Sequence, residues 1–379
     1  MKTVCGLDVH KDSVFVCILL PDGGKNEQKF GVTTPELLLL RGMLLENGVI
    51  EVAMESTSIY WIPIWRILED SFDLKLVNPY FIKQLPGRKS DIKDAQWIAT
   101  VLQKELIKGS FVPDQIIACL RQYGRRVFKL VRQKVRVEQS IDRQLQRCNI
   151  RISNYISTID SKAMQKIMDK LIEGIIDPEQ LVKCVHTRTK NKHGIETIKA
   201  SLTGRIEQVD IDMLCQFKEE QLLINKQIEE TLARMSAICR DNFPEQMQIL
   251  QAIPGIKERS AMMILSEIGS DLKKFLSSSA LVGWAGLKPR NDESAGKIKS
   301  RKTTHGNKYL RVYLVQAAWA SVRTQSSRFN FKYNLFLSRK MKKQKALIAI
   351  ARKLLVVIWN IISKNEQYRP YTNAVRALA

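Results

Sequence analysis

Four carboxylates near the start of the chain have the chemistry of a divalent-metal site. Asp8 ends an apolar, β-branched run, and Glu55 ends the run VAME. Asp91 and Asp94 lie three residues apart in KSDIKDAQ, a spacing that places both on one face of a helix. Like charges held close together raise one another's pKa unless a cation lies between them. Mg²⁺ prefers oxygen ligands, and a pair of such ions suits phosphoryl transfer, so we expect these residues to hold two Mg²⁺ ions.

Taken singly, the same acids also have structural explanations. Asp8 could cap a turn, and Asp91 could stabilise a helix N-terminus. Asp12 is interpreted as a turn residue, and His10 is expected to pack or face solvent and not to bind metal. The metal-site interpretation therefore depends on whether the fold brings the four acids together.

The elements that must position these acids follow from apolar patterns and turn residues. We expect strands at 3–9, 13–20 and 28–32, a helix from 34 or 35 to 46, a strand at 49–54, a helix at 59–69, a strand at 74–77 and a helix at 90–107. This β-β-β-α-β-α-β-α order is that of a ribonuclease H-like α/β fold, whereas a Rossmann domain would open β-α-β. In a ribonuclease H-like sheet the first and fourth strands are neighbours, so Asp8 and Glu55 would reach the same edge.

Charge and composition favour a polyanionic partner. The 379 residues carry 61 Lys+Arg against 38 Asp+Glu, a net charge of +23. A membrane surface is the rival partner, but the longest apolar tract, 346–362, contains Arg352 and Lys353, so no membrane span is expected. The seven scattered Cys give no disulfide framework or zinc motif, and HExxH, P-loop and GxSxG motifs are absent. With no signal-peptide pattern at the start, a cytoplasmic protein is expected.

Several basic positions are candidate nucleic-acid contacts. The segment 121–136 carries seven basic residues and no acid, which favours a bound DNA or RNA over a solvated helix face. Basic residues also surround the Asp91/Asp94 pair and the segment 290–311. The predicted contact residues are Lys11, Arg88, Lys89, Lys93, Arg125, Arg126, Lys129, Arg132, Gly255, Lys297, Arg301, Lys302, Lys308 and Arg311.

We predict three domains: α/β at 1–112, a basic helix with a coiled-coil or linker region at 113–245, and a mostly α-helical domain at 246–379. A long helix over 209–240 could pair with the basic helix as an antiparallel coiled coil or with another protomer. Residues 155–200 are interpreted as a helical insertion or linker. Ser277 to Ser279 are expected to cap a helix running to Trp284.

The C-terminal third contains a turn and a serine of interest. Ile253-Pro254-Gly255-Ile256 between two helices is typical of a helix-hairpin-helix, whose main-chain N–H groups meet a phosphate. As a bare turn it could be an ordinary αα-hairpin, but the net charge of +23 favours binding to a nucleic-acid duplex. Ser294 is expected in a polar loop rich in Lys and Arg. On spacing alone it is not distinguished from a surface serine.

The chain resembles the DEDD-type insertion-sequence transposases, the Piv-like family of bridge-RNA-guided serine recombinases. The matching segments are GLDVHKDS, AMEST and KSDIKDAQWIA near the N-terminus, and IPGI…SEIG, F…LVGWAGLKP, ESAGK and HGNKYLR near the C-terminus. They cover both ends of the chain in order, whereas the middle matches only in length and helical character.

The resemblance implies a RuvC-like domain with Asp8, Glu55, Asp91 and Asp94 as metal ligands, and a transposase domain whose nucleophile is Ser294. In the family the serine is generally followed directly by Gly, whereas here Ala295 comes first. The resemblance further implies a phosphoserine–DNA intermediate, donor and target DNA, a guide RNA, and a homo-oligomer in which the two domains of one site could come from different subunits. The alternative function is a metal-dependent RuvC-like junction nuclease without a covalent intermediate, and a non-catalytic nucleic-acid-binding protein is the third.

Overall fold

The computed structural model describes residues 2–78, 91–107, 109–290, 292–294, 297–300, 302–325 and 327–370, with the backbone alone at 91–93, 292–294, 298 and 299. The chain forms two compact units, Met1–Val112 and Pro113–Ala379.

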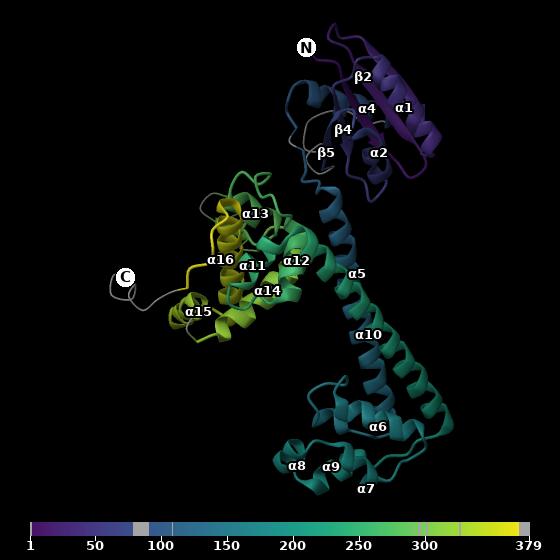
Figure 1. Cartoon of the computed structure of the whole chain (residues 1–379), viewed down its shortest axis with the longest axis vertical. Helices are drawn as coiled ribbons and strands as arrows, with labels where there is room; N and C mark the ends of the chain where they lie inside the picture. Colours follow the sequence, from purple (N-terminus) through teal and green to yellow (C-terminus); the bar gives the residue numbers. More distant parts are fainter. Residues whose placement is uncertain are drawn as a thin grey trace. The chain divides into compact units, whose positions relative to one another are not determined.

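The first unit is built on a five-stranded sheet (Figure 1). Its strands are β1 (Val4–Val9), β2 (Val14–Leu19), β3 (Lys25–Phe30), β4 (Glu51–Glu55) and β5 (Asp73–Val77), in the spatial order β3-β2-β1-β4-β5. The strands β1 to β3 pair antiparallel, whereas β4 runs parallel to β1 and β5 runs parallel to β4. The expected adjacency of the first and fourth strands is therefore confirmed.

Helices cover both faces of this sheet. Helices α1 (Thr34–Glu46) and α2 (Trp61–Leu68) pack against one face. The buried residues are Leu37, Leu40 and Leu44 on α1 and Ile64 and Leu68 on α2. Helix α4 (Asp91–Gln103) buries Ala95, Ile98, Ala99 and Leu102 against the other face. This i, i+3, i+4, i+7 spacing is the apolar stripe of an amphipathic helix. The mixed α/β unit is consistent with the ribonuclease H-like order expected from the sequence.

One strand boundary was predicted wrongly. The third strand covers Lys25–Phe30 and not 28–32, because the turn at Gly23 is tight and pairs Lys25 directly with Leu19. Five of its six residues are exposed, so no apolar alternation marked it in the sequence.

The second unit opens with two long antiparallel helices, α5 (Gln115–Arg147) and α10 (Gln208–Asn242) (Figure 1). Their direction follows from the hydrogen bonds that Arg126 makes to Gln227 and that Gln144 makes to Asp210. Between them the chain forms α6 (Lys162–Ile172), α7 (Pro178–Leu181), α8 (Thr187–His193) and α9 (Ile195–Leu202). The basic helix thus pairs within its own chain, one of the two possibilities left open by the sequence.

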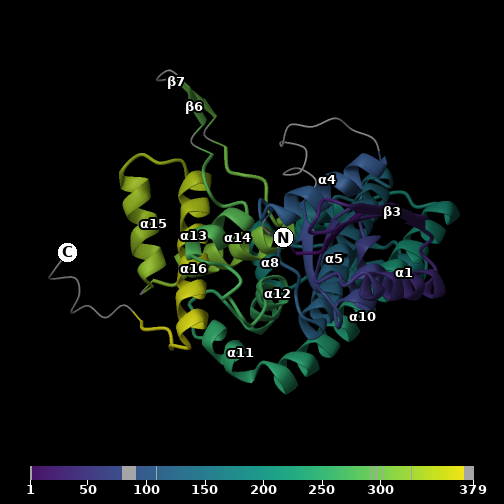
Figure 2. The same cartoon turned by 90° about the horizontal axis from the view of Figure 1, so that it is seen from above.

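The remaining helices of the second unit are α11 (Pro244–Gln251), α12 (Glu258–Ile268), α13 (Ser278–Trp284), α14 (Lys308–Arg323), α15 (Arg328–Ser338) and α16 (Lys343–Lys364). They pack on α14 and α16: α12 contacts α14, α11 and α13 contact α16, and α15 contacts both. Ser277 caps α13 by accepting a hydrogen bond from the Ala280 N–H, as predicted. Between α13 and α14 a two-stranded hairpin, β6 (Asp292–Ser294) and β7 (Lys297–Ser300), extends beyond the helices of this unit (Figure 2).

Helix α16 is, within the described part of the chain, the one helix long and apolar enough by length and composition to cross a membrane. In the second unit, however, it packs against α13, α14 and α15 and buries eight of its residues, as the core helix of a folded domain does.

Candidate active site and nucleic-acid interface

The two strand-end acids lie side by side at one edge of the sheet. In the parallel pairing of β1 and β4, Leu7 is opposite Met54, so Asp8 and Glu55 follow at the carboxyl ends of neighbouring strands. Asp8 is buried, with a relative exposure of 6%. The sheet therefore supplies two of the four predicted carboxylates directly.

Gly6 brings the third acid within range. Val4, Gly6 and Asp8 alternate along β1 and face α4. A Cβ atom on Gly6 would lie 2.2 Å from the Ala95 carbonyl oxygen and 2.4 Å from the Ala99 nitrogen, so only glycine lets the helix backbone approach this closely. Asp94 directly precedes Ala95, and its residue is half-buried. The glycine of GLDV thus sets the distance between α4 and the strand that carries Asp8.

The pKa of the Asp8 carboxyl is affected by the neighbouring acids. Burial raises the pKa of its carboxyl, the neighbouring His10 lowers it, and the negative charges of Glu55 and Asp94 raise it further. Both carboxylates therefore lie within electrostatic range of Asp8. His10 Nε2 is 3.1 Å from Asp8 Oδ2, and Glu55 Oε1 accepts a hydrogen bond of 3.2 Å from Thr57 Oγ1.

The donor set suits a hard divalent cation, because the buried carboxylate of Asp8 and the half-buried carboxylates of Glu55 and Asp94 repel one another and a cation between them would relieve that repulsion. Among the side chains that the structure describes, no three of His, Cys, Asp and Glu are close enough to hold a metal as they stand. The backbone of Asp91 begins α4, one helical turn before Asp94, but the Asp91 side chain lies outside the described residues. Arg88 and Lys89 also lie outside them, as does the side chain of Lys93.

Ser294 was expected in a loop, and the structure corrects this. It is the last residue of β6 and pairs with Lys297 at the start of β7. The polar sequence of the hairpin has no apolar alternation, so nothing local marked it as strand. The strands continue toward their base through a bridge between Pro289 and Thr303 and a hydrogen bond of 3.0 Å from the Arg290 N–H to the Lys302 carbonyl.

The base of this hairpin is fixed by close backbone packing. Gly286 has φ of +69°, and a Cβ on Gly306 would lie 2.2 Å from the Gly286 nitrogen. Arg311 then joins the two arms, because its Nη1 donates to the Gly286 carbonyl at 2.7 Å and to Thr303 Oγ1 at 2.8 Å. The motifs WAGLKP and HGNKYLR thus meet where the hairpin leaves the helical unit.

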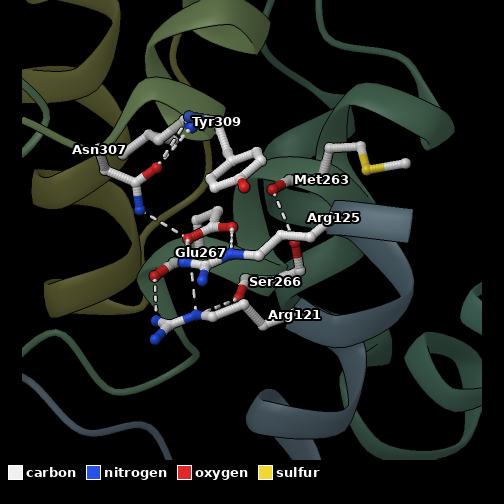
Figure 3. Close-up of polar contacts among 8 residues, drawn as sticks. Arg121, Arg125, Met263, Ser266, Glu267, Asn307 and Tyr309 are labelled. Carbon is white, nitrogen blue, oxygen red and sulfur yellow. Dashed lines mark hydrogen bonds and ion pairs between the residues drawn. The ribbon is translucent and has the colours of Figure 1, made fainter. Parts of the chain in front are cut away.

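A buried ionic cluster anchors the HGNKYLR segment at the base of the hairpin to helices α5 and α12 (Figure 3). Glu267 of α12 is 2% exposed and receives two hydrogen bonds from Arg125 of α5, at 3.0 and 3.1 Å. Asn307 donates to Glu267 Oε2 at 2.6 Å, while its own Oδ1 caps α14 by accepting from the Tyr309 and Leu310 N–H groups. The Arg125 guanidinium also lies 4.6 Å from the centre of the Tyr309 ring. The buried carboxylate of Glu267 therefore connects α5, α12 and the start of α14.

A basic hollow of about 770 Å³ lies between α5, α12 and α14. Its charged lining is Arg132, Arg259 and Lys308, which are exposed and form no ion pair with any residue that the structure describes. Its apolar lining includes Phe128 and Tyr313, whose rings are 6.4 Å apart, and Arg132 lies 5.9 Å above Phe128. Unneutralised cations beside aromatic rings are the combination that binds a phosphate and an adjoining base.

The turn predicted as a helix-hairpin-helix adjoins this hollow. Gly255 has φ of +87°, and a Cβ there would lie within 2.5 Å of Ser321 and Ala317 of α14. Close packing on α14 therefore accounts for this glycine. The turn leads into the first turn of α12, where Arg259 and Ser260 line the hollow, and a helix N-terminus favours an anion.

The other predicted contact residues fall into two groups. Arg125 and Arg311 are held in the internal contacts described above, and Arg126 donates to Gln227 at 2.9 Å. The exposed residues are Lys11, Lys129, Lys297 and Lys302. Arg301 lies outside the described residues. For all of these, nucleic-acid binding stays a prediction.

Sequence reasoning missed several residues that shape these sites. His10 could have been linked to Asp8, because it lies two residues further on, directly after the end of β1, and residues two apart in an extended chain share a side. Gly6 carried the signal of a glycine inside an apolar strand, which indicates close backbone approach. Glu267 and Asn307 had no local signal, since their partners are remote in the sequence. Arg259 had none either, because the hollow that it lines is formed by three helices that are distant in the sequence.

Comparisons with known proteins agree with this arrangement. Residues 5–150 match a family model described as Transposase, of the DEDD type of IS110, and residues 247–334 match the model described as Transposase IS116/IS110/IS902 family. Both models thus describe transposases, and they cover the carboxylate edge and the serine-bearing segment. The chain belongs to the IS110 family of DEDD transposases.

Individual relatives are similar over parts of their length. The transposase for insertion sequence element IS1111A of Coxiella burnetii is 28% identical over 174 residues, which are 44% of this chain and 45% of that protein. The putative transposase y4pF/y4sB of Sinorhizobium fredii is 24% identical over 318 residues, 80% of this chain and 71% of the relative. The pilin gene-inverting protein of Moraxella bovis is 31% identical over 133 residues, 34% of this chain and 41% of the relative.

Proposed function

We propose that the protein is a site-specific DNA recombinase of an insertion sequence, which cuts and exchanges DNA strands through Ser294 with the help of the carboxylate edge of a RuvC-like domain. The observation that carries the proposal is that Asp8 and Glu55 lie at the ends of neighbouring parallel strands, with Asp94 of α4 within electrostatic range of Asp8, in a chain that matches two transposase models. The similarity to a pilin gene-inverting protein adds a relative whose name denotes inversion of a gene.

The chemistry assigned to each residue follows from its position. Ser294 Oγ loses its proton and attacks a DNA phosphorus, the bond from phosphorus to the leaving sugar oxygen breaks, and that oxygen takes up one proton and leaves as a hydroxyl. The new serine phosphodiester keeps the energy of the old one, so a second strand can displace it without ATP. Asp8, Glu55, Asp91 and Asp94 would hold two Mg²⁺ ions, which, when bound, stabilise negative charge on the phosphate.

The chain's own residues would hold these groups in place. His10 fixes the orientation of the Asp8 carboxylate through their hydrogen bond. The Glu267 cluster and the Gly286–Gly306 packing fix the base from which the Ser294 hairpin extends. The basic hollow at Arg132, Arg259 and Lys308 would bind a phosphate of the DNA or RNA strand.

The proposed partners are donor and target DNA, a structured guide RNA and further copies of the chain, in the cytoplasm. The net charge of +23 supports a polyanionic partner, and the guide RNA is supported by the resemblance given above. RNA bound at equimolar ratio after purification from the native host, and recombination that depends on it, would be the direct evidence.

A second candidate is a metal-dependent junction nuclease, favoured by the fact that the carboxylate edge forms within the first unit alone. A strand-exchange assay with Mg²⁺ separates the two. Asp8→Asn should abolish cleavage under both proposals while DNA binding persists. Ser294→Ala should abolish cleavage and exchange in a serine recombinase, and it should leave cleavage intact in a metal-only nuclease.

A further inference from the structure

The chain contains a long segment without any acidic residue. From Ala295 to Asn365 there are seventeen Lys and Arg residues and no Asp or Glu. This segment includes α14, α15 and α16, so these helices have no acidic residue of their own with which to neutralise their cations. Such one-sided charge repels itself unless a polyanion is bound.

Four of these cations gather in a second hollow, between α15 and α16. It has a volume of about 630 Å³ and is lined by Arg328 and Lys332 of α15 and by Arg352 and Lys353 of α16. None of the four forms an ion pair or a hydrogen bond with an acidic residue in the part of the chain that the structure describes. The apolar side of the hollow includes Phe336.

The cations in this hollow disfavour one another. Burial lowers the pKa of Lys332, and the positive charges of Lys353 and Arg328 lower it further. The folded chain therefore keeps a partly buried lysine beside like charges, which is unfavourable for stability in the absence of a ligand. Natural sequences that keep such an arrangement usually use it to bind a group of opposite charge.

We propose that the hollow between α15 and α16 binds successive phosphate groups of a nucleic-acid backbone. The site is separate in sequence from the basic hollow at Arg132, Arg259 and Lys308 and from the Ser294 hairpin, and none of its residues belongs to the predicted contact set. It deepens the proposed function in one respect, because it rests on nucleic acid being the polyanion. Phosphates are bound here as point charges, so no sequence preference is expected.

The test compares two double variants of equal charge. Lys332→Gln with Lys353→Gln removes two cations from the hollow. Lys343→Gln with Lys345→Gln removes two exposed cations from the first turn of α16 that do not line it. Binding of fluorescent duplex DNA, single-stranded DNA and RNA of matched length is measured by anisotropy at several salt concentrations, without divalent cations.

For Lys332→Gln/Lys353→Gln, affinity for the nucleic acid that occupies the hollow should fall about tenfold near 0.15 M salt. The slope of log K against log salt should become less steep by the amount that about two phosphate contacts contribute. The control variant should change affinity much less. An equal loss in both variants would overturn the proposal, because total charge and not the hollow would then govern binding. The nucleic acid that responds most identifies the strand type bound.

Two further measurements make the outcome unambiguous. Lys332→Met should raise the melting temperature while it weakens binding, because it removes an unfavourable charge, and a purely structural lysine would show the opposite change in stability. Weaker binding to vesicles of anionic phospholipid with unchanged nucleic-acid binding would also overturn the proposal, in favour of a lipid surface. Because no strand exchange is measured, failure of the serine chemistry leaves this test intact.

Discussion

The position of α4 against β1 can be tested by adding one carbon atom. In Gly6→Ala the new Cβ would lie 2.2 Å from the Ala95 carbonyl oxygen, whereas ordinary contacts of a Cβ begin at 3.4 Å. Because the atom that the Cβ meets belongs to the backbone of α4 and cannot rotate away in a close-packed interior, α4 must move away from β1 by about 1 Å. Overpacking of this kind costs about 1–3 kcal/mol of stability.

The same displacement moves Asp94 relative to Asp8. Misplacement of a catalytic group by about 1 Å is expected to lower the rate of strand exchange about 100-fold. Rates are measured under single-turnover conditions with Mg²⁺, next to thermal melts that show how much folded protein is present. The matched control is Gly42→Ala in α1, where no atom lies within 4 Å of the new Cβ and the helix should gain about 0.5–1 kcal/mol.

If Gly6→Ala kept the parent's rate and melting temperature, Gly6 would not set the distance between α4 and β1. If Gly42→Ala lost activity to the same extent, a general sensitivity to alanine would explain both results.

Three further predictions concern charge. In EDTA, the raised folded-state pKa of Asp8 means that its contribution to stability is present below the unfolded value of 3.8 and is lost as pH rises through the folded value. Thermal melts should therefore show the parent losing stability relative to Asp8→Asn above about pH 4. Mg²⁺ at a hundred times its Kd should stabilise the parent alone by about 2.7 kcal/mol. Identical pH profiles for the two proteins would contradict this. Glu267→Gln should lower the free energy of unfolding in urea by about 3 kcal/mol, near the low end for a buried pair because the Arg125 side chain is 39% exposed. The double variant Glu267→Met/Arg125→Met should lose less stability than Glu267→Gln, because it leaves no uncompensated Arg125 charge. Arg259→Gln should weaken single-strand binding severalfold and reduce its salt slope by about 0.7, one phosphate contact, and an unchanged slope would exclude the hollow at Arg259 as a phosphate site.

Much of the carboxylate edge was predictable because its signals are local. Apolar runs that end in Asp8 and Glu55 define strands, and the order of elements makes those strands neighbours. The spacing of Asp91 and Asp94 needed only the periodicity of a helix. The sequence does not reveal the distance between α4 and β1, which depends on the contact of Gly6 with Ala95 and Ala99, about ninety positions away.

The second unit was less predictable because long-range pairing determines it. Glu267 is satisfied by Arg125, 142 positions away, and by Asn307, 40 positions away. The Ser294 hairpin is polar, so its strands have no apolar face that a period of two could reveal. The same holds for the exposed strand β3. In each case cross-strand or interhelical partners, and not local propensity, decide the structure.

We propose that Ser294 becomes covalently joined to DNA during strand exchange. The most direct measurement is to stop a reaction of the parent protein with labelled DNA by denaturation, digest the protein, and map the labelled peptide by mass spectrometry. We predict a phosphodiester on Ser294 that requires Mg²⁺ and that is absent in Asp8→Asn and Ser294→Ala. Cleavage of the DNA without any adduct in the parent protein would contradict the account and favour a metal-only nuclease.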